Sequence, residues 1–320
     1  MRQIWKRAAQ SLAAGIVVMG LVSGAQAQVR NDGPVKVIVP FSPGALIDNI
    51  ARLYADKLSA RLNRPVVVEN RPGAGGMVGT QRLLNEAPDK NTLLFVSSSY
   101  AVNPSIHKNP PFDTLKDLSG VALIAYSPTL VVVNPQSGFT SIQDFVAKAK
   151  AADPHMNYGS AGVNSATDLV GRYFSQETGA ELEHIPYKGV QEGVAEVVAG
   201  RIDTSFPPVA LALPFIKDNR LVPLAITSKE RSGLLPDVPT LHDTVAQNFE
   251  YTIWYGVIMN ALSSDEAKKE MAEHIAEITR DPDVIQRLES QGLVPQTRTL
   301  ADFDKYIASE ISKFGKILKD

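Results

Sequence analysis

Three short segments of the chain are rich in small and hydroxylated residues, which can bind an anion without a cationic side chain. They are Ser42 to Asp48, Ser97 to Asn103 and Gly159 to Asp168. Each segment lies where an apolar run gives way to a helical pattern. The free N–H groups and the positive dipole end of a helix would therefore face a ligand bound there. A carboxylate is the simplest ligand for such donors.

Ordinary helix capping explains part of the same composition. Ser165 fits an N-cap, and Asp168 would complete a capping box by accepting the N–H of Ser165. Asp48 lies in the first turn of its helix, where a carboxylate stabilises the helix dipole by about 0.3–1 kcal/mol. We favour a second role for Asp48, in which its carboxylate faces the ligand and accepts a donor such as an ammonium group. Capping leaves further N–H groups unfilled in each helix, so three such segments favour binding.

Sequence signatures of catalysis and of bound cofactors are missing. The chain has no G-x-S-x-G elbow, no H-E-x-x-H and no histidine pair at helical ligand spacing. It has no cysteine, which excludes disulfides, thiolate ligands and a cysteine nucleophile. The run from Gly73 to Gly79 reads G-x-G-x-x-x-G, which is the wrong spacing for a dinucleotide site and is typical of a tight turn beneath a helix. We therefore predict no enzyme activity, no metal and no cofactor.

The elements that position the three segments alternate between strand and helix. Strands are predicted at residues 35–40, 66–68, 92–96, 129–133, 156–159, 182–186, 202–206, 221–227 and from 251. Helices are predicted at residues 46–62, 77–87, 141–152, 166–178, 191–199, 264–280, 282–291 and 300–317. Nearly continuous apolar strands between helices indicate parallel sheets covered on both faces. In such sheets ligands bind outside the carboxyl ends of the strands, where the three segments lie.

The first 27 residues have the pattern of a secretory signal peptide. Cations at positions 2, 6 and 7 precede an apolar run from Leu12 to Val22, and Ala25-Gln26-Ala27 has the form of a cleavage site. The apolar run is shorter than the roughly 20 residues that span a bilayer. We expect cleavage before Gln28 and a mature protein in the periplasm.

The mature chain has the charge and the length of an anionic, two-domain protein. Without the three cations of the signal peptide, 29 Lys and Arg face 34 Asp and Glu, a net charge of −5. Such a chain has no general attraction for nucleic acid or anionic lipid. Its 293 residues exceed what one core usually covers. Since no low-complexity linker separates the halves, we expect domains joined by crossing strands.

A series of motifs runs through the whole mature chain in a fixed order. They are Pro40-Phe41-Ser42-Pro43-Gly44 with Asp48, Val68-Glu69-Asn70-Arg71-Pro72-Gly73-Ala74-Gly75-Gly76, Asn103-Pro104-Ser105, Tyr158-Gly159-Ser160-Ala161-Gly162, Pro186-Tyr187-Lys188-Gly189, Leu235-Pro236-Asp237-Val238-Pro239-Thr240 and Trp254-Tyr255-Gly256. In order and spacing they resemble the Bug family, the extracytoplasmic solute receptors of tripartite tricarboxylate transporters.

This resemblance implies an α/β protein of two-domain, type II periplasmic-binding-protein architecture, with a mainly parallel sheet in each lobe and a ligand cleft between the lobes. Residues 28–126 and 251–320 would form lobe 1, and residues 127–250 would form lobe 2. The implied function is a non-enzymatic receptor, expected to be a monomer, that delivers a small carboxylate to the membrane subunits of a tripartite tricarboxylate transporter. A ligand-sensing partner of a signalling system is the alternative, and an enzyme is a more remote one.

In the family, the loops that match Ser42–Ile47 and Gly162–Thr167 bind a ligand carboxylate, largely through backbone donors. The predicted ligand-binding residues are Ser42, Gly44, Ala45, Leu46, Ile47, Asp48, Ser98, Ser99, Tyr100, Gly162, Val163, Asn164, Ser165, Ala166, Thr167, Tyr187, Phe206 and Pro207. Ala45, Leu46 and Ile47 are larger and more apolar than the residues usual in the family. We therefore expect a drier pocket that suits a ligand with an apolar or aromatic body.

Overall fold

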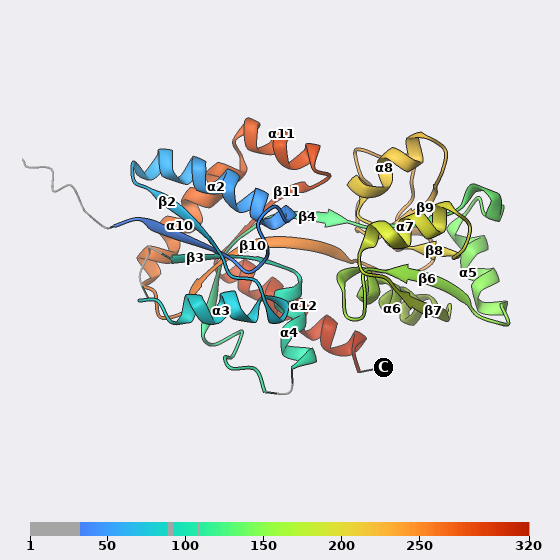
Figure 1. The fold of residues 1–320 in the computed structure, drawn as a ribbon, viewed down its shortest axis with the longest axis horizontal. Helices are drawn as coiled ribbons and strands as arrows, with labels where there is room; N and C mark the ends of the chain where they lie inside the picture. The colour runs from blue at the N-terminus through green and yellow to red at the C-terminus, as the bar shows by residue number, and fades with distance from the viewer. Residues whose placement is uncertain (1–32, 89–91, 108, 320) are drawn as a thin grey trace, which may run out of the picture. The chain divides into compact units, whose positions relative to one another are not determined.

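The computed structural model describes residues 33–88, 92–107 and 109–319. The predicted signal peptide lies outside the described residues. Within those ranges, no helix is both long enough and apolar enough to cross a membrane. The chain folds into two lobes, each built on its own mixed sheet (Figure 1).

The first lobe contains a six-stranded sheet in the order β11-β4-β10-β3-β1-β2. Its strands are β1 (Val35–Val39), β2 (Val66–Asn70), β3 (Thr92–Ser97), β4 (Leu118–Pro128), β10 (Thr252–Asn260) and β11 (Val294–Thr299). The helices of this lobe are α2 (Leu46–Leu62), α3 (Met77–Leu84), α4 (Ser99–Ile106), α10 (Asp265–Thr279), α11 (Pro282–Ser290) and α12 (Ala301–Ile317), with a 3-10 turn η1 at Ala74–Gly76.

The helices of the first lobe cover both faces of its sheet, and alternate side chains of β1 pack against them on opposite faces. Val37 and Val39 of β1 pack in one core with α2, α10 and α11, whereas Ile38 packs in another core with α3, α4 and α12. This alternation follows from the two-residue period of a strand. Both faces are covered, which explains why the strands are apolar almost throughout.

The second lobe contains a five-stranded sheet in the order β7-β6-β8-β5-β9. Its strands are β5 (Leu130–Val133), β6 (Met156–Ser160), β7 (Leu182–Pro186), β8 (Thr204–Ser205) and β9 (Val222–Ile226). Helices α5 (Ile142–Ala151) and α6 (Ala166–Thr178) share a core on one face, and α7 (Val190–Val198) and α8 (Val209–Lys217) share a core on the other. The short helix α9 (Leu241–Thr244) packs against α5, and a 3-10 turn η2 spans Pro135–Ser137.

The two-lobe α/β fold agrees with the prediction, but the sheets are mixed rather than mainly parallel. In the first sheet β1 is parallel to β2 and β3, whereas β10 is antiparallel to β3 and β4, and β11 is antiparallel to β4. In the second sheet β6 is parallel to β7 and β8, and β5 is antiparallel to β8 and β9. The antiparallel pairs arise because the chain leaves the first sheet along β4 and returns along β10.

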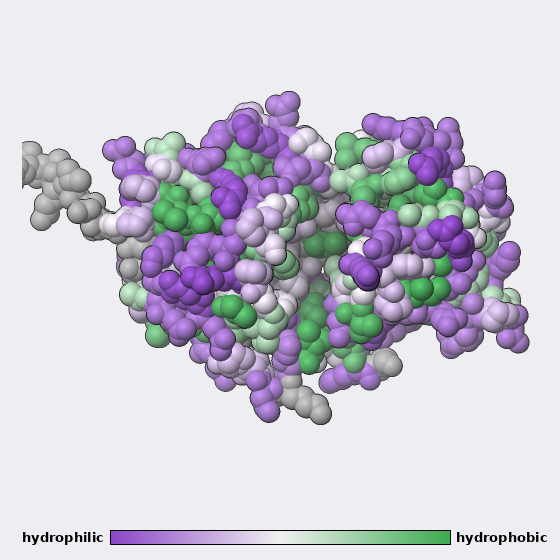
Figure 2. Space-filling view, viewed as in Figure 1, coloured by the Kyte–Doolittle hydropathy of each residue, from purple (hydrophilic) through white to green (hydrophobic). Residues whose placement is uncertain are grey.

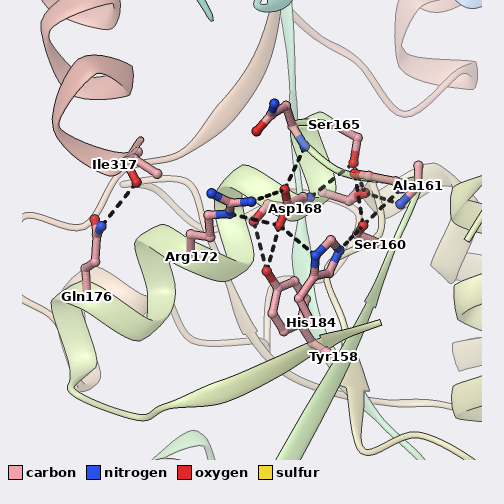
Figure 3. A network of polar contacts seen from close by, with 12 residues as sticks. Tyr158, Ser160, Ala161, Ser165, Asp168, Arg172, Gln176, His184 and Ile317 are labelled. Atoms are coloured by element: carbon pink, nitrogen blue, oxygen red, sulfur yellow. Dashed lines mark hydrogen bonds and ion pairs between the residues drawn. The ribbon is translucent and has the colours of Figure 1, made fainter. Parts of the chain in front are cut away.

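The crossing strands also bring the two lobes into direct contact. Thr252 of β10 pairs with Pro128 of β4, so the outgoing and returning chains lie side by side. Beside this pair, the Tyr251 hydroxyl donates to the carbonyl of Ala166 over 2.7 Å. Helix α12 packs against α6, where the Gln176 amide donates to the carbonyl of Ile317 over 3.3 Å (Figure 3). The domain limits at residues 126 and 251 stay a prediction.

Candidate functional site

The first loop, residues 40–45, connects β1 to α2 and is shaped by one buried carboxylate. Gly44 has a φ of +83°, a conformation that L side chains adopt only with strain. Its amide donates to Asp48 Oδ2 over 2.9 Å, and the Asn70 amide of β2 donates to Asp48 Oδ1 over 2.8 Å. Arg52, one turn further along α2, donates from Nε to Oδ2 over 3.0 Å. The Asp48 carboxylate therefore holds the backbone of the first loop in this conformation.

These contacts correct the ligand-facing role expected for Asp48. The residue is only 1% exposed, and both carboxylate oxygens already accept hydrogen bonds from the protein. Burial raises the pKa of Asp48, but the hydrogen bonds from Arg52, Asn70 and Gly44 outweigh it and hold the pKa below its usual value. Asp48 is therefore ionised at neutral pH, and its burial leaves no exposed oxygen for an ammonium group.

The first turn of α2 leaves backbone donors unused. The amide of Ala45 donates to the carbonyl of Ser42, which closes the loop. Among the described residues, the amides of Leu46 and Ile47 donate to no other group. Such N–H groups at a helix N-terminus form an anion-binding site.

The second loop, residues 161–165, connects β6 to α6 and has the same design. Asn164 takes a positive φ of +61°, and its amide donates to Asp168 Oδ2 over 2.7 Å. The amide of Ser165 donates to the carbonyl of Gly162, and the amides of Ala166 and Thr167 donate to no other described residue. Asp168 is bound in turn by Arg172, from Nε to Oδ1 over 3.2 Å and from a terminal nitrogen to Oδ2 over 3.1 Å.

Ser165 caps α6 as predicted, because its hydroxyl accepts the amide of Asp168 over 3.3 Å. The second half of the expected capping box is wrong. The Asp168 carboxylate accepts the N–H of Asn164, one residue before the N-cap, because the amide of Ser165 is already used by Gly162. The free donors of this loop begin at Ala166.

The two loops repeat each other residue by residue. In both, the residue just before the helix donates its amide to the carbonyl three residues earlier. The residue before that one, Gly44 or Asn164, has a positive φ, and an aspartate four residues after it accepts its amide. An arginine four positions after each aspartate completes the motif. This repeat was not predicted from the sequence, although two Asp-x-x-x-Arg patterns that follow apolar strands are its visible signal.

The second loop has additional polar support beneath it (Figure 3). The Tyr158 hydroxyl donates to Asp168 Oδ1 over 2.7 Å, and the Thr167 hydroxyl accepts the amide of Ala161 over 2.9 Å. Ser160 Oγ accepts the amide of Gly162 over 3.0 Å and lies 2.6 Å from His184 Nε2. Neither Ser160 nor His184 was predicted as a site residue from the sequence.

Two groups of this network have shifted pKa values. Burial raises the pKa of Tyr158 far above its usual value, and its hydrogen bond to Asp168 raises it further, so the hydroxyl remains a donor. Burial lowers the pKa of His184, the charge of Asp168 opposes this, and Arg172 lowers it again. The balance leaves the pKa of His184 below its usual value.

Several predicted site residues have side chains in the core. Ile47, in the first turn of α2, points into the core of the first lobe, and Phe206 packs against Tyr158 and Phe174. Ser98 and Tyr100 are buried, with the Tyr100 hydroxyl 3.3 Å from the carbonyl of Thr114. Ile47, Tyr100 and Phe206 use their apolar or aromatic surface in packing, and buried side chains of this kind do not face a ligand. Pro207 is also buried, and its carbonyl accepts the amide of Leu130.

Other predicted residues remain accessible around the two loops. Ser42 and Gly44 are exposed, and Ala45, Leu46, Ser99 and Tyr187 are partly exposed. Most of the face in Figure 2 is hydrophilic, and Val163 of the second loop is unusual in being 64% exposed. Tyr187 lies beside the second loop, since its amide donates to the carbonyl of Ser160. Within residues 33–88, 92–107 and 109–319, no cluster of acidic or histidine side chains could hold a metal ion.

Comparisons with known proteins agree with the two-lobe fold. Residues 50–320 match the model of the tripartite tricarboxylate transporter family receptor. Protein BugT of Bordetella pertussis is 30% identical over 307 residues, which cover 95% of this chain and 94% of BugT. A solved structure described as a periplasmic transporter is 32% identical, with a TM-score of 0.73 over 90% of this chain and 96% of that one. A structure of an R. palustris protein with adipate is 24% identical, with a TM-score of 0.74 over 89% and 96%.

Proposed function

The chain belongs to the tripartite tricarboxylate transporter family of receptors, and from this premise we propose that it binds a small carboxylate through the first and second loops. It delivers this ligand to the membrane subunits of a tripartite transporter and does not transform it. The signal-peptide pattern at residues 1–27 supports export to the periplasm, where such a receptor meets its solute.

One observation carries the proposal: the same anion-binding device occurs twice. Leu46 and Ile47 in α2, and Ala166 and Thr167 in α6, offer free amides at helix N-termini whose loops are fixed by buried aspartates. Backbone donors of this kind bind carboxylates without a cationic partner. Two such sites suit a ligand with two carboxylates, and adipate, which the R. palustris protein was solved with, has two joined by a methylene chain.

The accessible side chains beside these donors favour a ligand with an apolar or aromatic body. Ala45 and Leu46 are partly exposed next to the donors of α2, and Val163 is exposed next to those of α6. Every charge of a ligand that lacks a partner costs free energy when it leaves water. A third carboxylate, as in citrate, has no third set of donors in the two loops.

Calorimetry and thermal shift with adipate, benzoate and citrate test the proposal. Adipate at about 100 times its dissociation constant should stabilise the folded protein by about 2.7 kcal/mol, and citrate should bind more weakly. Tighter binding of citrate would refute the apolar-body assignment. A failure of all three carboxylates to bind the mature protein would refute the receptor function, and chemical conversion of bound adipate would refute the non-enzymatic role.

A further inference from the structure

His184 joins the supports of the second loop from a neighbouring strand. It lies on β7, which pairs with β6 so that His184 is opposite Tyr158. The two rings stack, with centroids 4.9 Å apart and an interplanar angle of 21°. From this position Nε2 lies 2.6 Å from Ser160 Oγ and Nδ1 lies 3.5 Å from Asp168 Oδ1 (Figure 3).

The two groups that His184 contacts hold the loop at two separate points. Ser160 Oγ accepts the amide of Gly162 over 3.0 Å and lies 3.2 Å from the carbonyl of the same residue. Asp168 Oδ2 accepts the amide of Asn164 over 2.7 Å. Gly162 and Asn164 both have positive φ angles, of +110° and +61°, so these bonds hold the backbone at the two residues where it turns.

We infer that His184 is a positioning residue, which fixes the second loop for ligand binding by connecting the Ser160 and Asp168 supports. The imidazole does not need to touch the ligand, because its effect passes through Gly162 and Asn164 to the donors of α6. The part of this inference that concerns affinity rests on the proposed function, whereas the part that concerns loop order does not.

A proton on His184 would add polar contacts to the network, although burial opposes the charge and lowers the pKa of His184. A neutral imidazole that accepts the Ser160 hydroxyl proton takes that proton away from the carbonyl of Gly162. A neutral imidazole protonated at Nε2 presents a lone pair to Asp168. An imidazolium donates to Ser160 from Nε2 and forms an ion pair with Asp168 from Nδ1 over 3.5 Å, so the Ser160 hydroxyl is free to donate to the carbonyl of Gly162.

The charged groups around the ring set the direction of the ligand effect. Asp168 and Arg172 of α6 face the ring and are paired with each other, and Tyr158 of β6 is a neutral donor. A carboxylate bound at Ala166 and Thr167 adds an anion nearby, which favours the imidazolium. By linkage, adipate should bind more tightly as pH falls towards the pKa of His184.

Amide hydrogen exchange tests the positioning role without a ligand. In His184→Phe, which keeps the ring stack and removes both nitrogens, the Gly162 and Asn164 amides should exchange about fivefold faster or more, the value of one lost hydrogen bond. In Ser160→Ala only the Gly162 amide should change. Gly44 of the first loop is the internal control, and Glu183→Gln, an exposed change on the same strand, is the matched variant. Unchanged exchange at both amides in His184→Phe would overturn the inference.

Two measurements with adipate complete the test. His184→Phe should weaken adipate binding about fivefold or more. The affinity of the wild-type protein for adipate should rise as pH falls from 8 to 5.5, and the affinity of the variant should not. In the wild-type protein, adipate should raise the pKa of His184 measured by NMR and leave that of the exposed His155 unchanged. Adipate binding with no shift at His184 would overturn the inference. If no carboxylate binds but exchange changes as expected, the proposed function fails and the positioning role stands.

Discussion

The first and second loops share one backbone design and differ in what supports it. Each has a positive-φ residue held by an aspartate that an arginine pairs with. Beneath the first loop the neighbouring strand supplies Asn70, an amide that cannot titrate, and the N-cap Ala45 offers no hydroxyl. Beneath the second loop the neighbouring strand supplies His184, and the N-cap is Ser165.

This comparison shows that the two loops can keep the same free backbone amides while the side chains that support those amides differ. The free amides are fixed by backbone geometry, which Asp48 and Asp168 impose in the same way. The supports decide how strongly each loop is held and whether pH affects it. We therefore expect the first loop to bind an anion equally at all pH values near neutrality, and the second to respond to protons.

Replacing each aspartate with alanine in turn should give the largest difference in stability between the two loops. Asp168→Ala leaves the Asn164 amide unpaired beside Arg172 and leaves the buried Tyr158 hydroxyl only its 3.5 Å contact with the carbonyl of residue 168. It should cost about 3–5 kcal/mol of unfolding free energy. Asp48→Ala should cost about 1–3 kcal/mol, because Arg52 has a half-exposed side chain and water can replace the lost partner. Urea denaturation of both variants measures the difference. Equal losses would show that the extra support of the second loop adds no stability.

Proline at the first position of each helix should weaken ligand binding with little effect on folding. Leu46→Pro and Ala166→Pro each remove one free amide, and the preceding residues, with ψ of 154° and 161°, already suit a following proline. Adipate should bind each variant about tenfold more weakly or worse, the value of a hydrogen bond to a charged group. Calorimetry measures this, with Leu46→Ala as the control for lost packing. Unchanged affinity in one variant would remove that loop from the site.

Exchanging the N-cap residues of α2 and α6 should reduce the difference in stability between the two loops. Ala45 has the extended conformation of an N-cap, with φ of −63° and ψ of 154°, so Ala45→Ser should stabilise the protein by about 0.5–1 kcal/mol. Ser165→Ala should cost about 1 kcal/mol. Thermal unfolding of the two variants and of their combination measures both effects. A destabilising Ala45→Ser would mean that the first loop cannot accommodate a cap hydroxyl.

The smallest expected effect is a pH dependence of stability that arises in the second lobe alone. Burial lowers the pKa of His184 in the folded state, so the unfolded chain binds more protons as pH falls below about 6.5. Stability should therefore fall from pH 7 towards the lowered pKa, and His184→Asn, which copies the first loop, should reduce this slope. Urea midpoints at several pH values test it, and a slope that is unchanged in the variant would contradict the assignment.

The elements with strong periodicity were predictable from the sequence, whereas those that depend on tertiary partners were not. Helix α6 spans residues 166–178 and β7 spans residues 182–186, as predicted. Strand β11 was missed because Val294–Thr299 is mostly polar with a proline, and it is a strand only because β4 pairs with it. Helix α8 was missed because two prolines precede it and Pro214 lies inside it.

In the candidate site, too, the local features were predictable from the sequence and the features that depend on distant partners were not. The sequence located both loops and the Ser165 cap, because caps and hydroxyl-rich turns are local signals. It gave Asp48 a ligand-facing role, since burial of that carboxylate depends on Asn70, which is distant in sequence. It missed His184 because the residue acts only once β7 lies beside β6.

The bond from the Tyr251 hydroxyl to the carbonyl of Ala166 has a mechanical consequence. Tyr251 is 1% exposed and lies where the returning chain enters β10, while Ala166 is the first residue of α6 and carries a free amide. If the lobes rotate about the strands that cross between them, the hydrogen bond from Tyr251 to Ala166 must break or the first turn of α6 must move with Tyr251. The hydroxyl therefore acts as a tether, through which force at the crossing strand is transmitted to the donors of the second loop.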